Sequence, residues 1–174
     1  MVFWHVGGAV FLFRLLFRDP GVDLRFLASG ALLPDAVDLL VGVVQGPEPG
    51  VTGRFYGHSL LLAAALLAVG LLTTERGGVG RKRAVVLAVG VMFHLLLDAM
   101  WLLPEVLLWP LAGSLSLAGT PGDWTGFPGS VTGNPAGLVQ EAAGFVYLIW
   151  LLGRAGLSDG AKRSRLWRTG VIGC

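Results

Sequence analysis

Residues 91–101, VMFHLLLDAMW, place an imidazole and a carboxylate in an otherwise apolar stretch. His94 and Asp98 are four positions apart, so on a helix they project from one face, about one turn from each other. An imidazole nitrogen and a carboxylate oxygen are both common ligands of divalent metal ions, so the pair could share a cation. The structural alternative is a hydrogen bond between helices, which a single polar residue in a membrane segment often makes.

Other ionisable residues lie in the apolar segments and raise the same question. They are His5, Asp35, Asp38, His58 and Glu141. An ionisable side chain at the centre of a bilayer costs at least ~2.5–3.5 kcal/mol on insertion scales, so each is a candidate functional residue.

Composition predicts an integral membrane protein that forms a single domain over residues 1–174. The chain is 54% hydrophobic and 14% charged, with a mean hydropathy of +0.72, whereas soluble domains contain about 25% charged residues. Residues 57–74 contain no Asp, Glu, Lys or Arg and are long enough to cross a bilayer. The only cysteine, Cys174, excludes an internal disulfide framework and a thiolate zinc cluster.

Five apolar segments are predicted to be helical, which indicates an all-α bundle of four to five transmembrane helices. The segments are 2–17, 24–44, 57–74, 84–109 and 136–153. The first is short and Pro34 interrupts the second, so either could be partly buried or re-entrant instead of spanning.

The basic residues predict the orientation. If the N-terminus is outside and all five segments cross, every one of the 13 basic residues except Arg54 falls on the inner side. Cytoplasmic loops carry such an excess of Lys and Arg. The sequence therefore predicts a multi-pass membrane protein with a basic cytoplasmic tail at residues 154–174.

The same topology gathers the ionisable residues into one layer. At ~1.5 Å per residue, each lies roughly 15–27 Å from the basic residue at the inner end of its segment, between mid-bilayer and the outer surface. Only Arg54, at the rim, could neutralise the carboxylates there. A divalent cation would do so, and mixed imidazole and carboxylate ligands suit Zn²⁺, or Mn²⁺ and Fe²⁺ less well.

Three motifs resemble the YdjM-like family of inner-membrane, metal-dependent hydrolases, over roughly residues 28–112. They are GALLPDAVDLL (30–40), GRFYGHSLLLAAALL (53–67) and FHLLLDAMWLLPEVLLWPL (93–111). The family is in turn distantly similar to the zinc-dependent phospholipase C and P1 nuclease group. Those phosphoesterases use more histidines than the three present here, so one metal or an incomplete pair is expected.

The resemblance also implies a role for each candidate ligand. Asp35, His58, His94 and Asp98 would hold one metal. Asp98 could bridge to a second metal held partly by His5, and Glu141 would match a late glutamate of the phosphoesterases.

The leading functional hypothesis is hydrolysis of a phosphoester or lipid-like substrate at the outer face of the membrane. Asp38 could take a proton or orient a ligand imidazole, Arg54 could pair with a substrate phosphate, and the 112–135 loop could cover the site. The alternatives are an ion or small-molecule transporter, for which Pro34 beside Asp35 would be a typical helix interruption, and a non-catalytic metal-binding membrane protein.

The expected partners are membrane lipids and the substrate. The basic segment KRSRLWR (162–168) suits anionic lipid headgroups, although it could also bind partner proteins. Nucleic-acid binding is not expected, and the sequence leaves the oligomeric state open.

Overall fold

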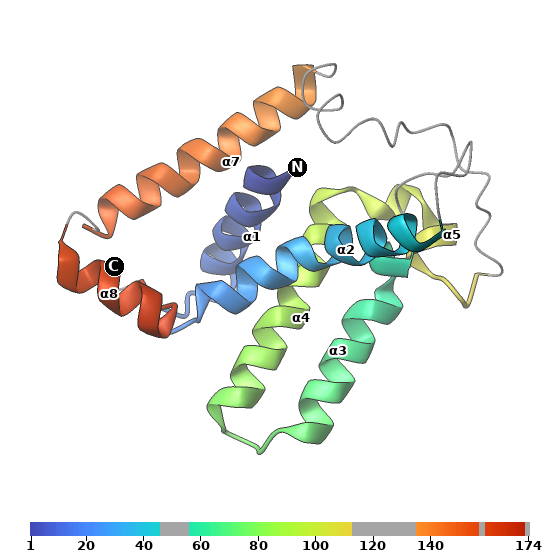
Figure 1. Ribbon diagram of the computed structural model, residues 1–174, viewed down its shortest axis with the longest axis horizontal. Coiled ribbons are helices and arrows are strands. Elements are labelled where there is room, and N and C mark those ends of the chain that lie inside the picture. Colours follow the sequence, from blue (N-terminus) through green and yellow to red (C-terminus); the bar gives the residue numbers. More distant parts are fainter. Residues whose placement is uncertain (46–55, 113–134, 157–158, 173–174) are drawn as a thin grey trace.

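A computed structural model describes residues 1–45, 56–112, 135–156 and 159–172, and every regular element in these ranges is helical (Figure 1). The all-α prediction is therefore confirmed. The α-helices are α1 (Val2–Leu16), α2 (Leu24–Gln45), α3 (Leu60–Thr73), α4 (Val79–Leu97), α5 (Pro104–Leu107), α7 (Pro135–Arg154) and α8 (Gly160–Thr169). Two 3₁₀ turns, η1 (Tyr56–His58) and η2 (Met100–Leu102), connect them.

Two described helices are long and apolar enough to cross a membrane, judged by length and composition. They are Leu24–Val44 within α2 and Pro135–Arg154, which is α7. Helices α1 and α3 are apolar but shorter, at 15 and 14 residues. Pro34 lies inside α2 without ending it. The structure thus supports two spans among the described helices, and does not by itself establish four or five.

The predicted single helix over 84–109 is wrong. Helix α4 ends at Leu97, Asp98 is its C-terminal cap residue, and Ala99 adopts a left-handed conformation with φ of 53°. A left-handed residue breaks the helical hydrogen-bond ladder, and Pro104 then begins the short helix α5. Asp98 therefore lies at a helix end, where the chain turns, and not in the middle of a span.

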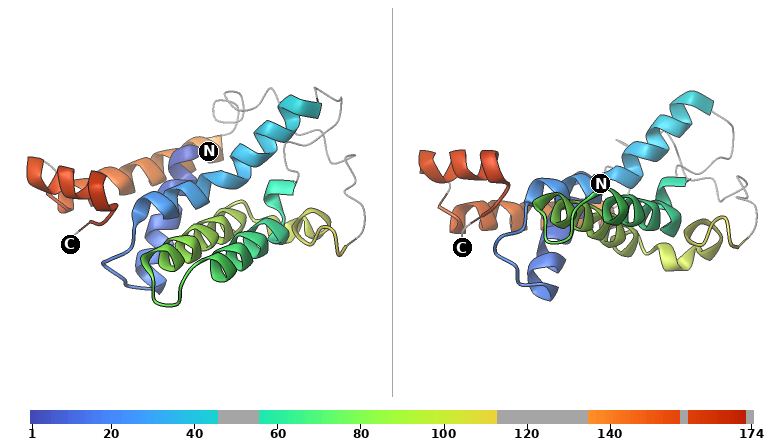
Figure 2. Two further views of the ribbon diagram at one scale, coloured as in Figure 1. Left: turned by 60° about the horizontal axis from the view of Figure 1, so that its bottom comes forward. Right: turned by 90° about the horizontal axis from the view of Figure 1, so that it is seen from below.

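Close helix crossings at small residues hold the bundle together. Helix α2 packs on α4, α3 lies alongside α4, and α1 packs on α7 (Figures 1 and 2). At the α2–α4 crossing, a Cβ on Gly30 would lie 2.1 Å from the Leu87 carbonyl oxygen, and one on Gly90 would lie 2.5 Å from that of Leu27. Small residues at crossings are typical of membrane helices, which gain stability from close backbone contact.

The crossing of α1 and α7 provides a test with a matched control on the same helix. A Cβ on Gly144 would lie 2.1 Å from the Phe3 carbonyl oxygen, whereas one on Gly153 would meet nothing within 4 Å. We expect Gly144→Ala to destabilise the protein by about 1–3 kcal/mol, because the helices must separate. Gly153→Ala should be neutral or stabilising, by up to ~1 kcal/mol. Thermal unfolding in detergent measures both, and equal stability of the two variants would contradict the crossing.

Candidate metal centre

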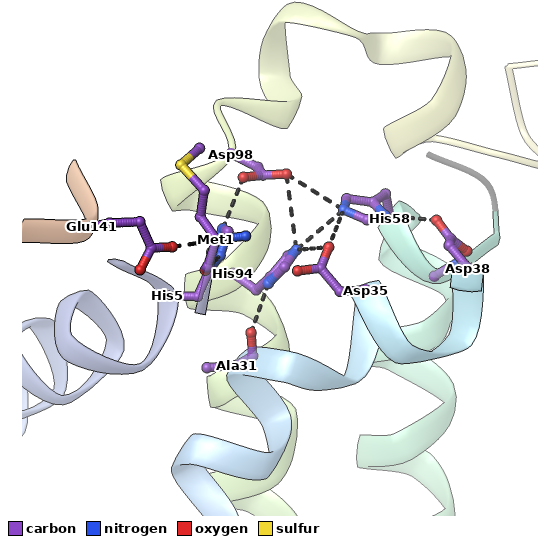
Figure 3. A network of polar contacts seen from close by, with 10 residues as sticks. Met1, His5, Ala31, Asp35, Asp38, His58, His94, Asp98 and Glu141 are labelled. Carbon is purple, nitrogen blue, oxygen red and sulfur yellow. Dashed lines mark hydrogen bonds and ion pairs between the residues drawn. The ribbon is translucent and has the colours of Figure 1, made fainter. Parts of the chain in front are cut away.

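All three histidines of the chain meet in one place, although they are far apart in the sequence (Figure 3). His5 lies near the start of α1, His58 ends η1, and His94 lies in the last turn of α4. The rings of His5 and His94 are stacked with centroids 4.1 Å apart, and His58 packs edge-on against His94 at 5.0 Å. Each residue is at most 2% exposed, so the cluster is built into the core.

The Nδ1 atom of every ring is held by a fixed oxygen acceptor. The acceptors are the Asp38 carboxylate for His58 at 2.7 Å, the Ala31 carbonyl for His94 at 2.7 Å, and the Met1 carbonyl for His5. Because these oxygens accept hydrogen bonds, each Nδ1 carries a proton, and a ring without a second proton presents a lone pair on Nε2. Such outer contacts fix the tautomer and orientation of metal-binding histidines.

Two of these lone pairs face each other. The Nε2 atoms of His58 and His94 are 3.1 Å apart. Neutral rings in this arrangement would repel, so either an additional proton or a shared cation must lie between them. The carboxylates of Asp35 and Asp98 supply the negative charge that would retain it.

Five distances among the donor atoms of these four residues lie near those expected around one tetrahedral ion. Asp35 Oδ1 is 3.6 Å from both Nε2 atoms, and Asp98 Oδ2 is 3.4 Å from that of His58 and 3.9 Å from that of His94. Zinc bonds of ~2.1 Å place neighbouring tetrahedral ligands about 3.4 Å apart. The donor types and spacings therefore match what Zn²⁺ would require.

Asp98 connects this group to the third histidine. Its Oδ1 lies 2.8 Å from His5 Nε2, while its Oδ2 faces the other two rings. The donor atoms form two overlapping groups, in each of which they lie within 4.8 Å of one another: His5, His94 and Asp98, and Asp35, His58 and His94. A carboxylate at the C-terminal end of a helix is repelled by the partial negative charge of the helix dipole there. A positively charged neighbour would therefore stabilise Asp98 further.

Asp35 and Asp38 lie one turn apart on α2 but occupy different positions around the site. The Asp35 side chain is 35% exposed, whereas that of Asp38 is 1% exposed. Asp38 Oδ1 accepts a hydrogen bond from the Gly57 amide at 2.6 Å, and its Oδ2 accepts one from His58. A Cβ on Gly57 would lie 2.3 Å from the Pro34 carbonyl oxygen, so glycine is needed for η1 to approach α2.

Glu141 belongs to neither donor group and instead holds the first turn of α1. Its Oε2 accepts a hydrogen bond from the Phe3 amide at 2.8 Å, and its Oε1 lies 3.9 Å from the Met1 amine (Figure 3).

Arg54 and residues 113–134 lie outside the described residues, so the proposed phosphate contact and the covering loop remain predictions. Met1 and Ala31 are not among the predicted site residues, because each contributes a backbone carbonyl that no residue type reveals.

The contact of Glu141 with Phe3 can be tested by amide exchange. Replacing Glu141 with Ala removes the acceptor at the N-terminal end of α1, an effect comparable to the loss of a helix cap, about 1 kcal/mol. We expect Phe3 and its neighbours to exchange roughly fivefold faster or more. Glu141→Gln retains an acceptor oxygen and should show a smaller change. Unaltered exchange in the Ala variant would mean that this contact does not hold the turn.

Comparison with known proteins identifies the family. Residues 1–159 match the pattern of the family described as YdjM inner membrane protein. No curated protein and no solved structure gives a significant match. The family match extends beyond the 28–112 stretch with the three motifs and covers every described helix except α8. The chain therefore belongs to the YdjM inner membrane protein family.

Proposed function

We propose that this inner-membrane protein is a metal-dependent hydrolase that acts on a phosphoester or lipid-like substrate at the outer face of the membrane. The observation that carries the proposal is the convergence of three Nε2 atoms on two carboxylates, with each Nδ1 already occupied. This donor set suits Zn²⁺ best, with Mn²⁺ or Fe²⁺ as alternatives.

Asp35, His58, His94 and Asp98 would hold one ion, and the His5 side of Asp98 would form part of a second position. A bound divalent cation supplies Lewis-acid polarisation of an ester or phosphoryl oxygen and makes a water molecule acidic enough to attack at neutral pH. The exposed Asp35 carboxylate marks the side from which substrate and water would enter.

Two further residues would support the reaction from outside the ligand set. Asp38 is buried and hydrogen-bonded to His58, which favours an orienting role for it over proton exchange with substrate. Arg54 precedes Gly57 by three residues and would supply a positive charge for a substrate phosphate.

The interior below the site favours a hydrolase over a transporter. A transporter would need a polar path from the histidines to the basic end of the bundle. The core cluster between the histidines and Asp23 at the basic end is instead apolar and includes Val10 and Phe13 of α1, Leu27 of α2 and Val86 of α4. A site with the partly exposed Asp35 on one side and packed hydrocarbon on the other supports catalysis at one membrane face.

The placement of charges supports a multi-pass topology with a cytoplasmic C-terminus. The ion pairs Lys82–Asp19 at 2.7 Å and Arg83–Asp23 at 3.1 Å lie at the opposite end of the bundle from the histidines. Helices α1 and α3 would be about 21–23 Å long, short of the ~30 Å hydrocarbon core. Local thinning of the bilayer could accommodate this mismatch.

Metal content and activity test the proposal together. We expect the purified, detergent-solubilised protein to contain about one equivalent of Zn²⁺ by elemental analysis, since the proposed ligands Asp35, His58, His94 and Asp98 would supply the four positions of one tetrahedral ion. With excess Zn²⁺ or Mn²⁺ it should hydrolyse phosphoesters, and His94→Ala should abolish both metal binding and hydrolysis. Glu105→Gln, at an exposed carboxylate on α5, is the control. Hydrolysis that survives in the His94 variant would reject the assignment.

The role of Asp38 predicts a separate change in metal affinity. Asp38→Asn removes the negative charge. It replaces the carboxylate that accepts a hydrogen bond from His58 Nδ1 with a neutral amide. Loss of such an outer contact typically weakens metal binding by about 10–100-fold. Competition with a chromogenic chelator measures the affinity. A variant that binds Zn²⁺ as tightly as the wild type would show that Asp38 does not orient the ligand.

A further inference from the structure

Helix α8 is a folded, strongly basic element and not an irregular tail. Asp159 caps its N-terminus by accepting a hydrogen bond from the Ala161 amide at 2.8 Å. The sequence GAKRSRLWRT contains no acidic residue. Its exposed side chains include Trp167, which is 78% exposed, and four basic residues: Lys162, Arg163, Arg165 and Arg168.

The C-terminal end of α8 is fixed to the start of α2. Arg25 Nη1 donates to the Trp167 carbonyl at 2.8 Å, and the Leu24 amide donates to the Gly170 carbonyl at 2.8 Å. Gly170 has φ of 71°, and a Cβ there would lie 1.7 Å from Asp23 Oδ1. The backbone of α8 thus ends directly against the first turn of α2.

Asp23 lies beneath this junction between two arginines. Asp23 accepts hydrogen bonds from Arg25 at 2.9 Å and from Arg83 at 3.1 Å. These contacts hold the pKa of Asp23 below its ordinary range, with the Arg25 hydrogen bond as the largest favourable cause, so it is ionised at neutral pH. Asp23 therefore offsets one of these two positive charges, whereas α8 contains no acidic residue to offset its four.

The connections of α8 determine its position relative to the membrane. Helix α7, a candidate span, ends at Arg154, and α8 begins at Gly160. The other end of α8 lies beside Leu24, where the second candidate span begins. Helix α8, about 15 Å long, therefore connects the same-side ends of two spans (Figure 1). A helix tied in this way lies along the membrane surface and not across it.

We propose that α8 binds the headgroups of anionic phospholipids in the membrane that α2 and α7 enter. Each basic residue near an anionic surface contributes about 1 kcal/mol, and an exposed tryptophan is favoured at the depth of the headgroups. The fixed attachment to α2 lowers the entropic cost, since the helix is already formed and oriented before lipid binds. This proposal does not depend on the metal centre.

Hydrogen exchange of the full-length protein in nanodiscs tests the proposal. One set of discs contains phosphatidylcholine alone and the other an equal mixture with phosphatidylglycerol. We expect α8 amides to exchange at least about fivefold more slowly in the anionic discs, because a stabilisation of ~1 kcal/mol slows exchange by this factor. High salt should remove this difference, because it screens exposed charges.

Two double variants separate charge from shape. Arg165→Glu with Arg168→Glu should abolish the lipid-dependent protection, whereas Arg165→Lys with Arg168→Lys should retain it. The exchange rates of α3 and α4 amides report whether each variant is folded. The salt series is measured on the wild type, so it tests the role of charge even if a variant fails to fold.

Three results would overturn the proposal. They are equal α8 exchange in both kinds of disc, protection that persists in the charge-reversed variant, and protection in phosphatidylcholine discs on addition of soluble glycerol phosphate alone. The last result would indicate a site for a free phosphate and not for a membrane surface.

Discussion

The Nδ1 hydrogen bonds of three buried histidines are the constraint on which the described site depends. Once His58, His94 and His5 each donate from Nδ1, their remaining nitrogens must point inward toward one another and toward Asp98. Buried lone pairs and carboxylates in such proximity are unfavourable without positive charge. A positive charge would therefore stabilise the polar cluster, and the helices must approach closely enough to enclose it.

Glycine makes that approach possible. Gly30 and Gly90 bring the backbones of α2 and α4 into contact, which places the Ala31 carbonyl within reach of His94. Gly57 brings η1 against α2 and so allows Asp38 to hold His58. Close packing of the helices therefore also sets the geometry of the site, because a shift of one helix would separate an imidazole from its acceptor.

The two ends of the bundle serve different purposes. The end with the histidines holds buried ionisable groups that hydrogen-bond mainly to one another, beside the partly exposed Asp35. The opposite end holds ion pairs such as Arg83–Asp23, and the basic helix α8 is attached there. The apolar residues between them, including Phe13 and Leu27, keep the two charged layers apart. This asymmetry agrees with the proposals of a reactive site at one face and a lipid-binding helix at the other.

The sequence by itself determined the helical class, the extent of most helices and the identity of the residues that form the polar cluster. These follow from local chemistry, since apolar runs form helices and isolated His and Asp residues stand out within them. Only the tertiary structure decided that α4 ends at Leu97 with Asp98 as its cap residue, that Glu141 holds the start of α1, and that α8 is attached to α2. Each of these depends on a backbone group or a contact between distant segments, and residue type and spacing do not encode where the backbone of another helix will lie.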